Sequence, residues 1–165
     1  MVILEKERTI KICGDVLSTL FKYRQIERTS SESGGVLIGR ENLLNENLIV
    51  EYLTEPMEND KRTRTRFLRQ DKGHIDYYNN LYEKYGGIYL YVGEWHTHPE
   101  DFPKYSIIDL SNWKKISKTL PKNAKQFHII VGNKALRVWE FSRAGNRARE
   151  IATYDWREEI DGKEN

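Results

Sequence analysis

Apolar residues recur along this chain with two different periods, which predict a mixture of strands and helices. Short apolar or alternating runs predict strands at 8–12, 36–39, 48–53, 88–96, 127–131, 135–141 and 149–156. Helical spacing predicts helices over about a dozen residues from Gly14, over 71–85, and from Ser106 to about Leu120. Strands interspersed with long helices indicate an α/β fold, in which a single mixed β-sheet is flanked by helices.

Turn residues mark several of the expected boundaries. Gly86 and Gly87 end the second helix, and Gly132 begins a hairpin turn between two late strands. Residues 54–69 have no hydrophobic period and are dominated by charge, so we expect no regular element there. We expect one domain over residues 1–156, followed by a charged C-terminal tail over 157–165.

Composition and charge are typical of a soluble protein and exclude several functional classes. Of the 165 residues, 38% are hydrophobic and 32% charged, with no apolar run of membrane-spanning length and no secretory signal. The 27 basic and 25 acidic residues give a net charge of +2, which offers no argument for nucleic acid as a partner. Cys13 is the only cysteine, so no intrachain disulfide can form, and we expect a cytoplasmic location.

The tripeptide His96-Thr97-His98 carries the strongest chemical signal in the chain. Its two imidazoles project from the same side of an extended strand, because side chains alternate between faces. Ser106 and Asp109 follow at the start of the next predicted helix, where a plain N-cap and a helix-start carboxylate are the ordinary structural alternatives. The joint spacing instead favours a hydrolytic site in which two imidazoles and a carboxylate bind zinc.

A hydrolytic metal site also needs a base for the attacking water. Glu94 shares the strand face of the histidines, Glu100 follows them, and Glu32 precedes a flexible Gly-Gly pair. Spacing alone does not choose among these three carboxylates. His74 and His128 have no partner at ligand spacing, so we expect both to be structural.

Three segments, 32–39, 93–99 and 106–109, together resemble the JAB/JAMM/MPN metalloprotease family, most closely its small stand-alone prokaryotic branch. The likeness extends over residues 8–142 and implies a cytidine-deaminase-like topology. It implies that His96, His98 and Asp109 bind one Zn²⁺ ion, together with a water molecule. It further implies that Glu32 is the general acid/base and that Ser106 steadies the oxyanion.

The resemblance also implies an activity and a cellular setting. The expected reaction is hydrolysis of an isopeptide or peptide bond after the C-terminus of a ubiquitin-like or similarly conjugated protein. In the prokaryotic branch such enzymes release conjugated cGAS-like nucleotidyltransferases in antiphage defence. Partners from a ubiquitin-like conjugation system, encoded nearby, are therefore expected, as is a protein substrate with an extended C-terminal tail.

A basic stretch lies between the two halves of this motif. Six basic residues stand against one acid over 61–72, which is most simply a solvated loop. The alternative is a cleft edge in which Arg64, Arg66 and Phe67 clamp an extended substrate tail by adding a strand to it. Phosphate binding is a third possibility.

Two other functions remain open at this stage, and a third is excluded. An intact ligand set argues against a non-catalytic interaction scaffold, for which zinc content is the discriminating measurement. A RadC-like role near DNA repair shares the His-x-His-Pro run, but the modest charge weighs against it. Zinc deaminases need a His-x-Glu motif and a cysteine pair, and this chain has His98 and one cysteine instead.

Overall fold

The computed structural model describes residues 1–5, 7–42, 44–144 and 146–157. Its strands are β1 Val2–Leu4, β2 Thr9–Ile12, β3 Gly34–Glu41, β4 Leu48–Leu53, β5 Lys61–Thr63, β6 Arg66–Leu68, β7 Leu90–Thr97, β8 Lys125–Val131, β9 Ala135–Ser142 and β10 Arg147–Asp155. Its helices are α1 Gly14–Lys22, α2 Gly73–Lys84 and α3 Ile107–Ser117. The predicted tail over 157–165 lies outside the described residues, apart from Arg157.

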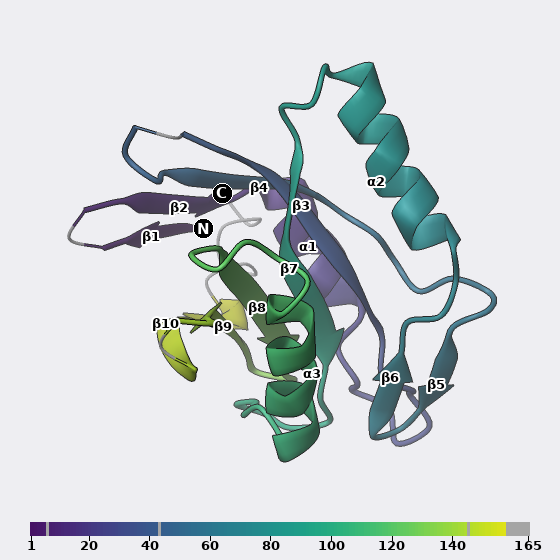
Figure 1. Ribbon diagram of the computed structural model, residues 1–165. Coiled ribbons are helices and arrows are strands. Elements are labelled where there is room, and N and C mark those ends of the chain that lie inside the picture. The colour runs from purple at the N-terminus through teal and green to yellow at the C-terminus, as the bar shows by residue number, and fades with distance from the viewer. Residues whose placement is uncertain (6, 43, 145, 158–165) are drawn as a thin grey trace.

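Eight strands form one mixed sheet in the order β1-β2-β4-β3-β7-β8-β9-β10, which confirms the predicted architecture. The β2/β4 and β7/β8 pairs are parallel, and the other neighbours are antiparallel. Helix α1 lies behind the sheet, whereas α2 and α3 lie in front of it (Figure 1). None of the helices in the described part of the chain is long and apolar enough to cross a membrane.

Each face of the sheet has its own apolar packing. The larger core lies on the α1 side, where Val16, Leu17 and Leu20 pack with strand residues such as Trp95. On the opposite side, α3 places Trp113 in a smaller cluster over β8 and β9. Alternate residues of the central strands therefore enter different layers, as a sheet covered on both faces requires.

Two elements were not expected from the sequence. Strand β1 has three residues, and only Ile3 is buried, so it has too little pattern to be recognised. The β5–β6 hairpin falls within the stretch 54–69, for which we predicted no regular structure. Its side chains are almost all exposed and half of them are basic, and hydrophobic alternation is absent because the hairpin is not part of the main sheet. Helix α3 also ends at Ser117, three residues before the predicted end.

A β-bulge in β7 fixes which side chains face α3. Leu37 pairs with Gly93 and Ile38 with Tyr91, so Val92 is an extra residue on β7. A Cβ atom on Gly93 would lie 1.7 Å from the carbonyl oxygen of Phe127, which leaves room only for glycine. Beyond the bulge the histidines face α3, and Trp95 faces the α1 core.

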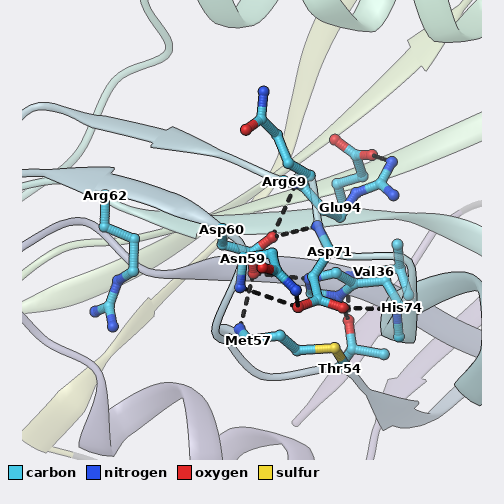
Figure 2. A network of polar contacts seen from close by, with 12 residues as sticks. Val36, Thr54, Met57, Asn59, Asp60, Arg62, Arg69, Asp71, His74 and Glu94 are labelled. Carbon is cyan, nitrogen blue, oxygen red and sulfur yellow. Dashed lines mark hydrogen bonds and ion pairs between the residues drawn. The ribbon is translucent and has the colours of Figure 1, made fainter.

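A buried carboxylate closes the base of the segment that carries the β5–β6 hairpin (Figure 2). The Asp60 side chain has no exposed surface and accepts three backbone N–H groups. These donors are the amides of Met57 at 2.8 Å, Gln70 at 2.9 Å and Asp71 at 3.0 Å. One side chain thus joins the two ends of the hairpin segment.

His74, at the start of α2, connects this carboxylate to the sheet. Its Nε2 lies 2.8 Å from Asp60, and its Nδ1 lies 2.5 Å from the Thr54 hydroxyl. That hydroxyl oxygen also accepts the amide of Val36 at 2.9 Å. The network assigns the Nε2 proton to His74, with Nδ1 as the acceptor. His74 is fully buried and has the structural role that we expected.

Candidate metal centre

The end of β7 and the start of α3 bring two imidazoles and a carboxylate together. His96 lies in β7, His98 directly follows that strand, and Asp109 lies in the first turn of α3. The Nε2 atoms of the histidines are 3.0 Å apart, and carboxylate oxygens of Asp109 lie 3.2 Å from His96 and 3.5 Å from His98. Of the described residues, only these three form a potential metal-binding group, with ligand atoms within 4.8 Å of one another.

The chemistry of this donor set suits zinc. Two imidazole nitrogens and one carboxylate oxygen are a usual ligand set of catalytic zinc sites, which keep one further position for water. The three side chains are between 11% and 14% exposed, so an ion here is shielded from solvent yet remains accessible. The residues present therefore fit a single divalent ion.

The N-terminus of α3 aims the carboxylate at the histidines. Ser106 is the N-cap: its Oγ accepts the amide of Asp109 at 3.1 Å, and its own amide donates to Asp109 Oδ2 at 2.6 Å. This reciprocal capping box holds the rotamer of Asp109 while leaving both oxygens close to the imidazoles. The structural and the metal-binding interpretations of these two residues are therefore compatible.

The charges of the three groups depend on one another. Burial acts to raise the pKa of Asp109, but hydrogen bonding to His96, the charge of His96 and the contacts with Ser106 outweigh it and hold that pKa well below its usual range. Burial acts to lower the pKa of His96, yet the neighbouring carboxylate raises it. The pKa of His98 is lowered by burial and by the positive charge of His96. Protonation of one imidazole beside the carboxylate is thus favoured, and protonation of the second imidazole is disfavoured.

Glu32 approaches the two imidazoles from the segment that precedes β3, a neighbour of β7 in the sheet. It lies two residues before Gly34, which pairs with His96 across the β3/β7 ladder. Its Oε1 is 3.9 Å from Nε2 of His98, and the residue is 5% exposed. Burial, with the negative charge of Asp109, raises the pKa of Glu32 to about 7, although His96 opposes the shift. A carboxyl group with this pKa can both accept and donate a proton near neutral pH.

The β5–β6 hairpin holds the backbone of Glu32. The amide of Glu32 donates to Thr63 at 2.7 Å, and its carbonyl oxygen accepts Nε of Arg62 at 2.7 Å. The ring of Phe67 lies directly over Gly34, where a Cβ atom would be 2.5 Å from it. The basic stretch between the two halves of the motif therefore supports the Glu32 segment.

The other two candidate bases have hydrogen-bond partners of their own. Glu94 pairs with Arg69 (Figure 2), at a distance of 2.8 Å, and Glu100 accepts the backbone amide of Lys104 at 2.9 Å. Glu32 is therefore the candidate that the structure places against the imidazoles.

A groove of about 630 Å³ runs over the site between the hairpin and α3. Its lining includes the predicted residues Glu32, Arg66, Phe67, His96, His98, Ser106 and Asp109. Arg64, predicted to contact substrate, is not part of this lining. Its guanidinium instead donates to the carbonyl oxygens of Glu27 at 3.1 Å and Arg28 at 2.6 Å.

Several residues around the site had no signal in the sequence. Arg62 and Arg69 appeared only as members of a charged stretch, and Gln25 was not noticed at all. Their partners lie far away in sequence, and no fixed spacing relates them to the histidines. His128, expected to be structural, is buried and stacks on Trp113 with ring centroids 4.3 Å apart.

Comparison with known proteins places this geometry in a family. The family model for prokaryotic homologs of the JAB domain matches residues 20–144. A protein from Vibrio cholerae named CD-NTase/cGAS isopeptidase is 35% identical over 90% of this chain and 88% of its own length. A protein of the same name from Escherichia coli is 41% identical over 63% of this chain, and the match spans 65% of that relative.

A structural match agrees at the level of the fold. The solution structure of a protein from Desulfitobacterium hafniense superposes with a TM-score of 0.56 and 16% identity, covering 86% of this chain and 88% of the other. The expected JAB-type α/β fold is therefore confirmed, together with the resemblance from which it was inferred. The chain belongs to the family of prokaryotic homologs of the JAB domain.

Proposed function

We propose that this protein is a zinc-dependent isopeptidase that hydrolyses the bond after the C-terminus of a conjugated protein. The observation that carries the proposal is the convergence of His96, His98 and Asp109, with the Glu32 carboxylate 3.9 Å from His98. The names of the relatives support a CD-NTase/cGAS-like protein as the conjugated substrate.

The reaction divides among the side chains of the site. Zinc, when bound by the two histidines and Asp109, supplies Lewis acidity that polarises a carbonyl group and makes water a better nucleophile. Glu32 Oε1 accepts a proton from the attacking water and returns it to the departing amine nitrogen. In the metal-free protein the pKa of Glu32 is raised to about 7, which shows that this buried carboxyl group holds a proton more readily than an exposed one.

Ser106 is the proposed donor to the carbonyl oxygen as that oxygen gains negative charge. Its Oγ accepts the amide of Asp109 through a lone pair, and this capping bond leaves the hydroxyl proton available. Ser106 also lines the groove. A hydrogen bond that strengthens as charge develops stabilises the transition state selectively.

The hairpin edge of the groove is the proposed binding site for an extended substrate tail. Arg66 and Phe67 lie on β6 and line the groove, where an added strand can pair with the hairpin. Arg64 is turned toward the 27–28 loop, so we assign it an indirect part in this clamp.

A cleavage assay with metal analysis tests the catalytic part of the proposal. The substrate is a CD-NTase-like protein joined through its C-terminal carboxyl group to a reporter amine. We expect Glu32→Gln to keep one zinc ion per chain and to lower kcat by about 10²–10⁴-fold, because the proton acceptor is lost. His98→Ala should lose both zinc and activity. A Glu32→Gln variant with normal turnover would contradict the assignment.

The two arginines form a matched pair for testing the clamp. Arg66→Glu should raise KM several-fold and leave the zinc content unchanged, because it reverses a charge in the groove. Arg64→Glu reverses a charge outside the lining and should change KM much less. Equal effects of the two substitutions would refute a specific role of the groove edge.

The neighbouring genes test the proposed place in antiphage defence. We expect genes for a CD-NTase-like enzyme and for activating and conjugating enzymes next to this one. A sulfur-transfer cluster in their place would redirect the proposal to maturation of a ubiquitin-like carrier.

A further inference from the structure

Gln25 is a buried amide in the loop between α1 and β3, with 1% of its surface exposed. Its Nε2 donates to the carbonyl oxygens of Ser30 at 3.1 Å and Arg64 at 2.9 Å. Its Oε1 accepts the hydroxyl of Thr97 at 2.9 Å. Both N–H donors and the carbonyl oxygen of this side chain are thus satisfied inside the protein.

The three partners of Gln25 belong to three of the segments around the candidate site, the fourth being α3. Ser30 lies two residues before Glu32. Arg64 lies in the hairpin, next to the Thr63 carbonyl that accepts the Glu32 amide. Thr97 is the residue between the two metal-binding histidines. One amide therefore joins the base, the hairpin and the ligand strand.

The Thr97 hydroxyl continues the connection to the base. Besides donating to Gln25, its oxygen accepts the amide of Ser33 at 3.0 Å, and the Thr97 amide donates to the Ser33 carbonyl at 2.8 Å. Glu32 itself lies before the start of β3, outside the regular ladder. Its position relative to the histidines therefore depends on these contacts, together with those that the hairpin makes to the backbone of Glu32.

We propose that Gln25 is a positioning residue that holds Glu32 at its working distance from the metal ligands through the Thr97 hydroxyl and the Ser30 carbonyl. The inference rests on the proposed function, because the position of Glu32 affects turnover only if Glu32 transfers the proton. Gln25 does not touch the reacting atoms. A displacement of the base by about 1 Å is enough to lower kcat by about 100-fold.

Replacement of Gln25 by an apolar residue of similar length tests the proposal. We expect Gln25→Met to lower kcat by about 100-fold, while KM and zinc content stay within about two-fold of wild type. Gln126→Met is the matched control. Gln126 is also a buried glutamine; its Nε2 has no hydrogen-bond partner among the described residues, and its Oε1 contacts Nε2 of His128 at 3.2 Å instead of the Glu32 segment, so kcat should be unchanged.

The Thr97 side of the contact gives an independent pair of variants. Thr97→Val removes the hydroxyl without changing the shape and should reproduce the loss of kcat, whereas Thr97→Ser should restore most of it. The double variant Gln25→Met/Thr97→Val should lose less kcat than the product of the two single losses, because both substitutions break the Gln25–Thr97 hydrogen bond. A normal kcat in Gln25→Met, or a loss of kcat that follows a loss of zinc, overturns the proposal.

Amide hydrogen exchange gives a measurement that does not depend on activity. The amides of Glu32 and Ser33 should lose protection in Gln25→Met and retain it in Gln126→Met, with or without zinc. Absence of cleavage by the wild-type protein would refute the proposed function, and exchange would then decide the role of Gln25. Full protection of both amides in Gln25→Met would show that Gln25 does not hold the segment.

Discussion

Burial and a neighbouring negative charge change the proton affinity of the Glu32 carboxyl group. A carboxyl group that is 5% exposed and close to Asp109 has its pKa raised to about 7, against a usual value near 4.5. Between pH 4.5 and about 7, the metal-free folded protein therefore keeps a proton on Glu32 that the unfolded chain has released. The shift is a cost to the stability of the ionised fold, and a strongly shifted carboxyl group of this kind is typical of the proposed role as a proton carrier.

This shift predicts a pH-dependent stability of the metal-free protein. A raised carboxyl pKa contributes stability below pH 4.5 that is lost as pH rises toward about 7. Glu32→Gln removes that titration. The metal-free variant, prepared with a chelator, should therefore be more stable than the metal-free wild type at pH 8, by about 1–3 kcal/mol. Urea unfolding at several pH values measures the difference. If the free energy of unfolding of Glu32→Gln changes with pH as steeply as that of the wild type, another group is responsible for the titration.

The hydroxyl of Ser106 caps α3 and is also the proposed oxyanion donor, and substitution can separate the two roles. As an N-cap it should contribute about 1 kcal/mol relative to alanine but only a few tenths relative to glycine. Ser106→Ala and Ser106→Gly should therefore differ in unfolding free energy, yet both should lower kcat by about 10²-fold, since neither can donate to the oxyanion. Thermal unfolding and cleavage rates measure the two effects.

Ser111→Ala is the control for that comparison. It changes an exposed serine of the same helix and should leave both stability and turnover close to wild type. If the activities of Ser106→Ala and Ser106→Gly remain normal, the oxyanion role is wrong and the capping role remains.

At the scale of elements, the β5–β6 hairpin supports the Glu32 segment and is itself held by polar contacts at its base. Asp60, with no exposed side-chain surface, joins both ends of the hairpin segment, and His74 connects it to Thr54 beside β3. Burial acts to raise the pKa of Asp60, but backbone amides and His74 outweigh it and lower that pKa to about 2. The hairpin is therefore fixed by hydrogen bonds at its base instead of by an apolar core.

Asp60→Asn should weaken this element strongly. Loss of the charge leaves backbone amides and His74 with a poorer acceptor, and we expect a destabilisation of about 2–4 kcal/mol. The wild-type contribution is present above pH 3.8 and lost as pH falls toward 2, so the variant should be less sensitive to acid in that range. Asp76→Asn, on the half-exposed face of α2, should have little effect. Equal losses in both variants would rule out this role.

The strands and the site differ in how far the sequence predicts them. The central strands and three helices were predictable because their apolar residues follow the period of the element that buries them. The histidines, Asp109 and Glu32 were identified by their motif, and the structure brings their side chains together. The hairpin and Gln25 were not predictable, since their contacts are polar, long-range and unrelated to any period.

For the molecule as a whole, a metal held between β7 and α3 should add to global stability. Binding to the folded form alone contributes about 2.7 kcal/mol when free zinc is 100 times its Kd. Chelation should therefore lower the unfolding temperature of the wild-type protein and leave that of His98→Ala unchanged. Calorimetry with and without added zinc measures both. Identical behaviour of the two proteins would mean that zinc binds elsewhere.

The bulge at Val92 sets a limit on how such a chain can change in length. Loops at the rim of the sheet tolerate added or lost residues, because their ends keep their positions. One residue inserted between Val92 and His96 would exchange the two faces of the strand beyond it. Trp95 would then point at the groove and the first imidazole into the core, so that a single-codon insertion at this point would take a ligand away from the proposed metal site without replacing any residue of the motif.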